Sequence, residues 1–183
     1  MELAGKKILV IGMGKTGVAV SSFLGAHGAA VLAIDEKPRQ AWGTDAGRLR
    51  QNPWFGAKDY DPSALAGVDL VVPSPGVPPL NIILEAARKK NIPIMSEIEL
   101  ACLFIETPIL AITGTNGKTT TTTLLGRIFG RAGKKVFVGG NIGNPLVQYA
   151  AGDKTADFVI AEISSFQLQW ANTFRPHAAA LLN

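Results

Sequence analysis

The sequence predicts an α/β fold built on parallel sheets, and three patterns support this prediction. Short runs rich in Val, Ile and Leu occur from end to end of the chain without polar alternation, which is typical of strands buried on both faces. Helix-like segments separate these runs and supply the crossovers that parallel strands need. Gly-rich turns follow several runs, at the strand ends where open α/β sheets bind ligands.

Each predicted strand is an apolar run that ends at a turn residue. In chain order the predicted strands are Lys7–Ile11, Ala30–Ile34, Leu70–Val72, Ile92–Met95, Ile109–Thr113, Val136–Val138, Phe158–Ala161 and Ala178–Leu182. We expect helices after the Gly-rich turns, one of them beginning at about Lys118.

The chain is predicted to contain two nucleotide-binding units in tandem. The strand KILVIG opens the first unit and the strand ILAITG opens the second, and each leads into its own loop of phosphate-binding type. We place the boundary near Ser96. The prediction is a Rossmann-like domain over residues 1–96 and the opening part of a P-loop ATPase domain over residues 97–183.

Composition indicates an ordinary globular protein. The chain has 183 residues, of which 47% are hydrophobic and 17% charged, and its net charge is +4. Its densest basic groups, Arg88–Lys90 and Lys134–Lys135, fall where helices should end and suit the helix dipole. Aromatic residues make up only 7%, which disfavours a nucleic-acid surface. The single cysteine, Cys102, and the lack of a long apolar run favour a soluble cytoplasmic protein, with Cys102 packed in a helix.

The stretch Ile109–Thr123, ILAITGTNGKTTTTT, is the most informative part of the chain. A strand followed by a Gly-rich turn and a helix aims backbone N–H groups at one point, which binds phosphate, and Lys118 adds a positive charge. The loop is a shortened variant, because only Thr115 and Asn116 separate Gly114 from Gly117. A tight turn with a surface lysine is the alternative interpretation.

A second motif follows the first strand. Gly12, Gly14 and Gly17 have the G-x-G-x-x-G spacing, and Asp35 ends the next strand eighteen positions later. The pattern indicates NAD binding, with the acid on a ribose hydroxyl. The same geometry would hold another nucleotide diphosphate, and a turn without any ligand is also possible, so the loop alone does not name its ligand.

Three signatures, of which the loop after Ile109–Thr113 is the first, can be compared with known proteins. They are Thr113–Thr120 (TGTNGKTT), Gly140–Gly143 (GNIG) and Glu162–Leu168 (EISSFQL), in that order. Together they resemble the Mur ligases, ATP-dependent amide ligases of peptidoglycan precursor synthesis. The form of the last signature, with GMGKTG and Ser74-Pro75-Gly76, is most similar to the members that add D-glutamate.

The resemblance implies an ATP and Mg²⁺ site in the second unit. Residues Gly114, Thr115, Asn116, Gly117, Lys118, Thr119, Thr120 and Thr121 would bind ATP. Lys118 and Glu162 would be catalytic, and the Thr119 hydroxyl and Glu162 would hold Mg²⁺.

The resemblance also implies a UDP-linked substrate, so the apparent NAD motif would be a UDP site. Its expected contacts are Gly14, Lys15, Thr16, Asp35, Lys37, Ser74, Pro75, Gly76, Asn141, Ser164 and Gln167. Glu36-Lys37 follows Asp35 where many relatives have Thr-Arg, which leaves the uracil contact open.

The implied reaction joins D-glutamate to UDP-N-acetylmuramoyl-L-alanine. The substrate carboxylate attacks the γ-phosphate of ATP to give an acyl phosphate, which the amine of D-glutamate then displaces. The resemblance also implies a His-containing loop, a metal-facing Lys and a third domain after Asn183. We therefore expect this chain to be a truncated form without ligase activity of its own.

Three other interpretations remain open at this point. The first is an NAD(P)-dependent oxidoreductase or sensor built on Gly12–Gly17 and Asp35. The second is a stand-alone nucleotide-binding module that regulates a partner. The third is a different Mur ligase or a folylpolyglutamate synthetase relative, since these share the ATP loop.

Overall fold

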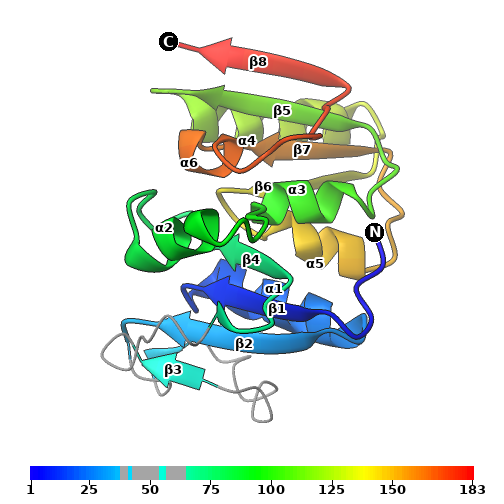
Figure 1. The fold of residues 1–183 in the computed structure, drawn as a ribbon. Helices are drawn as coiled ribbons and strands as arrows, with labels where there is room; N and C mark the ends of the chain where they lie inside the picture. Colours follow the sequence, from blue (N-terminus) through cyan, green and yellow to red (C-terminus); the bar gives the residue numbers. More distant parts are fainter. Residues whose placement is uncertain (38–40, 43–53, 57–64) are drawn as a thin grey trace. The chain divides into compact units, whose positions relative to one another are not determined.

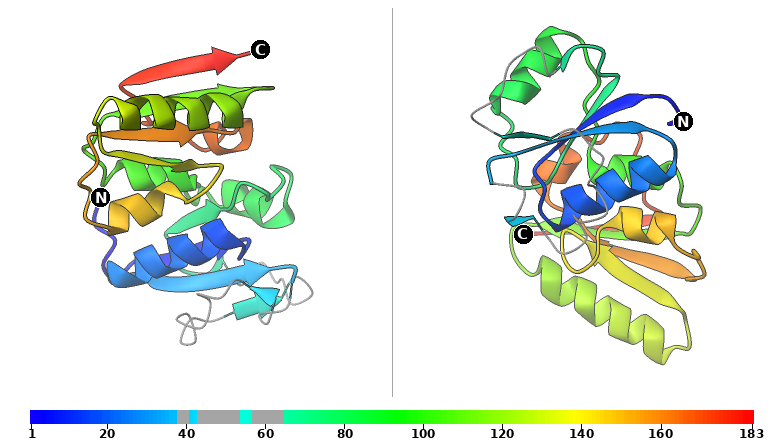
Figure 2. Two further views of the ribbon diagram at one scale, coloured as in Figure 1. Left: turned by 180° about the vertical axis from the view of Figure 1, so that it is seen from behind. Right: turned by 90° about the horizontal axis from the view of Figure 1, so that it is seen from below.

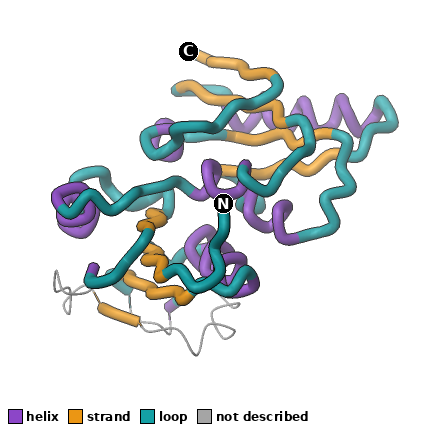
Figure 3. Tube along the Cα trace, turned by 45° about the vertical axis from the view of Figure 1, so that its right-hand side comes forward, coloured by secondary structure: helices purple, strands orange, loops and turns teal. Residues whose placement is uncertain are grey.

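The computed structural model describes residues 1–37, 41–42, 54–56 and 65–183. The chain divides into two compact units, Met1–Glu97 and Ile98–Asn183. Strands and helices follow one another along both units (Figures 1 and 3), and every described strand pairing is parallel. The predicted α/β class is therefore confirmed.

The first unit contains a four-stranded sheet in the order β3-β2-β1-β4. Its strands are β1 (Lys7–Ile11), β2 (Ala30–Asp35), β3 (Trp54–Gly56) and β4 (Leu70–Pro73). The chain runs outward from β1 through β2 to β3 and then returns to the other side of β1. The loops after β1 and β4 therefore lie at the topological switch point, where such sheets bind nucleotides.

Two helices of the first unit follow its functional loops. Helix α1 (Lys15–Ala26) begins directly after Gly14 and packs on β1 and β2 through a face that includes Val20, Phe23 and Leu24. Helix α2 (Ile82–Lys89) is capped by Asn81, whose side chain accepts a hydrogen bond of 2.9 Å from the Ile83 N–H. Arg88 and Lys89 lie in its last turn, as predicted from the helix dipole.

The second unit contains a four-stranded sheet in the order β6-β7-β5-β8. Its strands are β5 (Ile109–Gly114), β6 (Val136–Gly140), β7 (Phe158–Glu162) and β8 (Ala178–Leu182), and its helices are α3 (Glu97–Cys102), α4 (Lys118–Arg131), α5 (Leu146–Ala151) and α6 (Ser165–Leu168). Figure 2 shows α4 lying across one face of this sheet. Gly126 makes this close approach possible, because a Cβ there would come within 2.7 Å of Val138.

Two elements differ from the sequence-based prediction. The strand predicted over Ile92–Met95 is wrong, since Ile94 forms only an isolated bridge with Val71. Pro93 has no N–H to donate, so a regular ladder cannot continue through it. The short strand β3 was not predicted, because its three residues are too few to show a periodic pattern. No described helix is long and apolar enough to cross a bilayer.

Candidate functional site

The loop after β5 needs glycine at two positions. Gly114 has a φ of +130°, and a Cβ there would collide with the backbone carbonyl of Leu182 on the paired strand β8. Gly117 caps the N-terminus of α4 with a φ of +79°, in the left-handed region. The two glycines therefore allow β5 to turn tightly into α4 while β8 lies against the loop.

The polar groups of this loop are held by main-chain carbonyls. The Lys118 ammonium donates hydrogen bonds of 2.7 Å to the Gly114 carbonyl and 3.0 Å to the Thr115 carbonyl. The N–H groups of Thr115 and Asn116 both donate to the Asn183 carbonyl at 3.0 Å. The amide donors and the lysine charge expected from the sequence are thus brought together at the carboxyl end of β5.

A buried carboxylate lies beside the loop. Glu162 ends β7, is only 2% exposed, and accepts hydrogen bonds from the Thr119 hydroxyl at 2.7 Å and from the Asn141 side-chain amide at 2.9 Å. Strand β7 lies between β5 and β6. Glu162 ends β7, Asn141 directly follows β6, and Thr119 lies in the first turn of α4, the helix that follows β5. The resemblance named Thr119 and Glu162 for Mg²⁺ and Asn141 for the UDP-linked substrate, and in the structure Thr119 and Asn141 each donate to a different oxygen of Glu162.

The donor set fits Mg²⁺. A Thr hydroxyl and a Glu carboxylate are hard oxygen ligands, and Mg²⁺ is usually held by one or two protein oxygens together with phosphates and water. Within residues 1–37, 41–42, 54–56 and 65–183 there is no group of three or more His, Cys, Asp or Glu that could hold a metal. A cation at Thr119 and Glu162 would therefore depend on phosphate and water for its other ligands.

The threonines at the start of α4, Thr119–Thr123, differ in burial and in hydrogen bonding. Thr119 faces Glu162, Thr120 is exposed, and Thr121 is half-buried. No threonine hydroxyl caps the helix, because the N-cap is Gly117. The Thr122 hydroxyl is fully buried, and it finds no hydrogen-bond partner among the residues that the structure describes. Among these threonines, Thr119 is thus the one whose hydroxyl lies beside the Glu162 carboxylate, where the two could hold a cation together.

The segment after β7 forms a capped helical turn. The Ser164 hydroxyl accepts a hydrogen bond from the Gln167 N–H, and the Gln167 side-chain carbonyl accepts one of 2.9 Å from the Ser164 N–H. This reciprocal pair is a capping box. Gln167 is 2% exposed, and within the described part of the chain its Nε2 has no acceptor. An orphaned buried amide is costly, so it marks a position where a ligand acceptor would fit.

In the first unit, the Gly12–Gly17 loop is braced by two side chains. Ser74 directly follows β4, and its hydroxyl donates a hydrogen bond of 2.6 Å to the Gly12 carbonyl. Asp35, at the end of β2, accepts from the Met13 N–H and also from the Lys37 N–H at 2.6 Å. Gly17 must be glycine, because a Cβ there would collide with the Gly12 carbonyl. The loop is therefore fixed from both sides of the switch point.

The remaining predicted contacts of the first unit are exposed or half-buried around this loop. Gly14 and Lys15 at the start of α1 are exposed, Thr16 is half-buried, and Lys37 is exposed after Asp35. Pro75 is half-buried and Gly76 exposed in the loop after Ser74. The predicted residues of this unit thus surround the carboxyl ends of β1, β2 and β4, while their binding roles stay predictions.

Sequence reasoning missed the part played by strand β8. The Asn183 carbonyl accepts both loop amides, and the Leu182 backbone excludes a side chain at position 114. No residue pattern could have indicated this, because both contacts are made by the main chain and depend on the pairing of β8 with β5.

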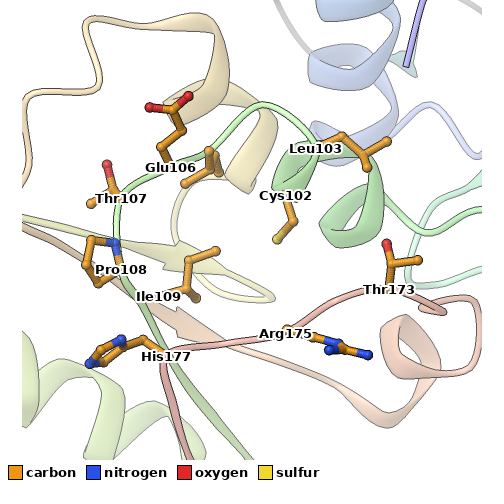
Figure 4. A pocket seen from close by; sticks show the side chains of 10 residues that line it. Cys102, Leu103, Glu106, Thr107, Pro108, Ile109, Thr173, Arg175 and His177 are labelled. Atoms are coloured by element: carbon orange, nitrogen blue, oxygen red, sulfur yellow. The ribbon is translucent and has the colours of Figure 1, made fainter.

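A cavity of about 470 Å³ lies elsewhere in the second unit, at the amino ends of β5 and β8. Cys102 lines it and is half-buried rather than packed in the core as expected. In Figure 4 the side chains of Arg175 and His177 point in opposite directions. The charged groups of this cavity do not converge on one point, and the Gly114–Lys118 loop lies at the other end of β5.

Comparison with known proteins identifies both units. Residues 6–96 match the family description "Mur ligase MurD-like, N-terminal domain" and residues 112–183 match "Mur ligase middle domain". The chain is 52% identical over its whole length to the UDP-N-acetylmuramoylalanine–D-glutamate ligase of Syntrophus aciditrophicus and 49% identical to that of Geobacter metallireducens. It spans 41% of the length of each of these relatives.

Solved structures with low sequence identity share the fold. A UDP-N-acetylmuramate:L-alanyl-gamma-D-glutamyl-meso-diaminopimelate ligase from Neisseria meningitidis is 22% identical with a TM-score of 0.56, over 97% of this chain and 60% of that one. A murein peptide ligase from Psychrobacter arcticus gives 21% identity and a TM-score of 0.55, over 98% of this chain and 44% of that one. With two Mur ligase domains matched in sequence and their fold found in the structure, the chain belongs to the Mur ligase family.

Proposed function

We propose that this chain is the substrate-binding and phosphate-binding portion of a ligase that joins D-glutamate to UDP-N-acetylmuramoyl-L-alanine at the expense of ATP. The observation that carries the proposal is the contact of Thr119, Asn141 and Glu162 beside the Gly114–Lys118 loop. It supports an ATP site in the second unit. The names of the relatives at 46–52% identity support this particular amino acid and nucleotide sugar.

The protein's part in the first chemical step would be positioning and charge neutralisation. Lys118 would exchange its bonds to two loop carbonyls for the outer phosphates of ATP, and the loop glycines leave room for the phosphates to approach. Mg²⁺ bound by Thr119 and Glu162 would neutralise negative charge on the phosphates. Asn141 would hold Glu162 in place, since its amide already bonds the second carboxylate oxygen.

The first unit would hold the UDP group. Its loop lies at the switch point of a parallel sheet, and α1 directs its N-terminus toward the same place, which suits a diphosphate. Membership of the Mur ligase family favours this assignment over the nicotinamide alternative. In the second unit, Asn141, Ser164 and Gln167 stay predicted contacts of the UDP-linked substrate, and the buried Nε2 of Gln167 without an acceptor among the described residues supports this for Gln167. A cytoplasmic location stays a prediction from the sequence.

Titration of the purified chain tests the ligand assignment. We expect calorimetry to show binding of UDP-N-acetylmuramoyl-L-alanine, weak binding of ATP with Mg²⁺, and no binding of NADH. Gly17→Ala should remove the UDP-ligand signal, whereas Lys118→Ala should leave it unchanged. Tight NADH binding that competes with the UDP ligand would overturn the proposal.

The ligase activity itself must be measured on a full-length ligase that contains this chain. We expect formation of UDP-N-acetylmuramoyl-L-alanyl-D-glutamate with release of ADP and phosphate. A full-length protein that used another amino acid in place of D-glutamate would contradict the proposed specificity.

A further inference from the structure

The Glu162 carboxylate holds a buried negative charge beside the Gly114–Lys118 loop. It is 2% exposed, and its two hydrogen bonds within the described part of the chain come from neutral donors, the Thr119 hydroxyl and the Asn141 side-chain amide. The ammonium of Lys118 donates to main-chain carbonyls of its own loop instead. Because buried carboxylates are as a rule paired with a positive charge or bound to a metal, this one is suited to a cation.

The two oxygens of this carboxylate have different partners. Thr119 donates to Oε2 at 2.7 Å, and the Nδ2 of Asn141 donates to Oε1 at 2.9 Å. A hydroxyl oxygen can turn its lone pairs to a cation, whereas an amide N–H can only donate. A cation that enters beside Thr119 would therefore replace the hydrogen bond at Oε2, and Asn141 would keep its bond to Oε1.

The main chain holds Asn141 in this position. Its N–H donates a hydrogen bond of 2.8 Å to the Glu162 carbonyl. Gly140 pairs with Glu162 in the β6–β7 ladder and has a φ of +99°, and a Cβ there would collide with the Glu162 carbonyl. The Gly140 N–H donates a hydrogen bond of 2.8 Å to the Asn144 carbonyl, which closes the loop. Backbone contacts thus fix the side-chain amide beside Oε1.

The number of oxygens that a carboxylate offers affects which divalent cation it prefers. Ca²⁺ accepts roughly six to eight oxygens in a flexible arrangement and often takes both oxygens of one carboxylate. Mg²⁺ requires a near-octahedral arrangement with its oxygens at about 2.0–2.1 Å, so it suits a carboxylate that offers one oxygen. A carboxylate whose second oxygen is held by a hydrogen bond resists bidentate binding, because that bond must weaken or break as the carboxylate turns.

We propose that Asn141 makes this site selective for Mg²⁺ over larger cations such as Ca²⁺, by holding Glu162 to a single metal-binding oxygen. Asn141 is a positioning residue, because it acts through Glu162. The inference rests on the ATP and Mg²⁺ site proposed above. It concerns only the oxygens that Glu162 offers, so it holds whichever other ligands the rest of a full-length ligase supplies. The bond to Oε1 uses one N–H, so the amide oxygen could still make the predicted contact with the UDP-linked substrate.

Calorimetric titration of a full-length ligase that contains this chain tests the proposal. The ligand is the non-hydrolysable β,γ-imido analogue of ATP, titrated once in saturating MgCl₂ and once in saturating CaCl₂, without the UDP-linked substrate. The selectivity is the ratio of the Ca²⁺ to the Mg²⁺ dissociation constant. Groups that orient a metal ligand are typically worth about 10–100-fold in affinity. Asn141→Ala should therefore weaken binding about tenfold or more in Mg²⁺, and by less than about threefold in Ca²⁺, since Glu162 can then offer both oxygens.

Two further variants separate the hydrogen bond from the loop that carries it. Asn141→Asp keeps the size of the side chain but replaces the N–H donor by a second carboxylate, so it should lower the selectivity further by strengthening binding in Ca²⁺. Asn144→Ala removes another exposed asparagine side chain of the same loop but keeps the carbonyl that Gly140 uses, and it should change the ratio by no more than about twofold. Circular dichroism should show that all variants remain folded.

Several outcomes would overturn the proposal. If Asn141→Ala left both complexes unchanged or weakened them equally, the amide would not select the cation. An equal change of the ratio in the Asn144→Ala protein would assign the effect to the loop as a whole. In these cases the ATP site itself would stand. If the unchanged ligase did not bind the analogue in either salt, the proposed ATP site would be wrong, and this inference with it.

Discussion

The two glycine-rich loops of this chain are held in different ways. The loop Gly12–Gly17 of the first unit is braced by side chains, with Ser74 donating to one of its carbonyls and Asp35 accepting from the Met13 N–H. The loop Gly114–Lys118 of the second unit is held by the main chain of β8 and by its own lysine. Both follow the central strand of a parallel sheet.

The difference shows how each loop can meet a phosphate group. In the first unit the bracing groups lie at the ends of β2 and β4, so the loop could keep its conformation if a diphosphate binds there as proposed. In the second unit Lys118, Thr119 and Glu162 are already hydrogen-bonded, so these bonds would have to be exchanged if ATP and Mg²⁺ bind there as proposed. Substitutions in the two loops should therefore affect stability and activity differently.

The largest effect is expected for Gly114→Ala. Its Cβ would collide with the Leu182 carbonyl, and its φ of +130° is unfavourable for alanine. We expect the free energy of unfolding of the second unit to fall by about 3–5 kcal/mol, measured by urea denaturation. Gly130→Ala, in the same unit, is the control. Nothing lies within 4 Å of its added Cβ, and it should stabilise α4 by about 0.5–1 kcal/mol. Equal stability in the two variants would contradict the close approach of β8.

Lys118→Ala should separate charge from fold in the second loop. In a full-length ligase we expect a loss of about 2–4 kcal/mol of transition-state stabilisation, measured as kcat/KM, because a preorganised positive charge on the phosphates is removed. Stability should change little, since the lysine contacts only exposed or half-buried carbonyls. Lys134→Ala, an exposed lysine after the same helix, should keep normal activity. Normal turnover in the Lys118 variant would exclude the loop from the mechanism.

Asp35→Asn should show how strongly a side chain braces the first loop. The variant keeps the size of the residue but loses the negative charge of the carboxylate, which accepts hydrogen bonds from the N–H groups of Met13 and Lys37. We expect the free energy of unfolding of the first unit to fall by about 1–2 kcal/mol and the affinity for the UDP ligand to fall with it. The exposed neighbour Glu36 provides a matched control, because Glu36→Gln should change stability by less than about 0.5 kcal/mol. Similar results for both substitutions would mean that Asp35 does not brace the loop.

The smallest effect is expected at the cap of α6. Ser164→Ala removes one half of the capping box with Gln167 and should cost about 1 kcal/mol in thermal or chemical unfolding. Ser165→Ala, at the next and exposed position, should be close to neutral. If the two alanine variants were equally stable, the capping box would not contribute to stability.

Much of the fold could be predicted because local patterns carry it. Strands β1, β2 and β5 are almost wholly apolar, and in β1 and β2 the run of buried residues shows that both faces are covered. Prediction failed where the local signal is short or contradictory. β3 has three residues, and Pro93 interrupts the pairing of the run Ile92–Met95.

The sequence by itself determined the fold class, the two loops and the types of residue around them, because glycine, lysine and carboxylate patterns follow from local backbone geometry and charge. The tertiary structure decided which groups meet. Glu162 lies between Thr119 and Asn141 because β7 is inserted between β5 and β6. The Asn183 carbonyl reaches the loop because β8 pairs with β5. Strand order is set by packing between distant segments, and no local pattern encodes it.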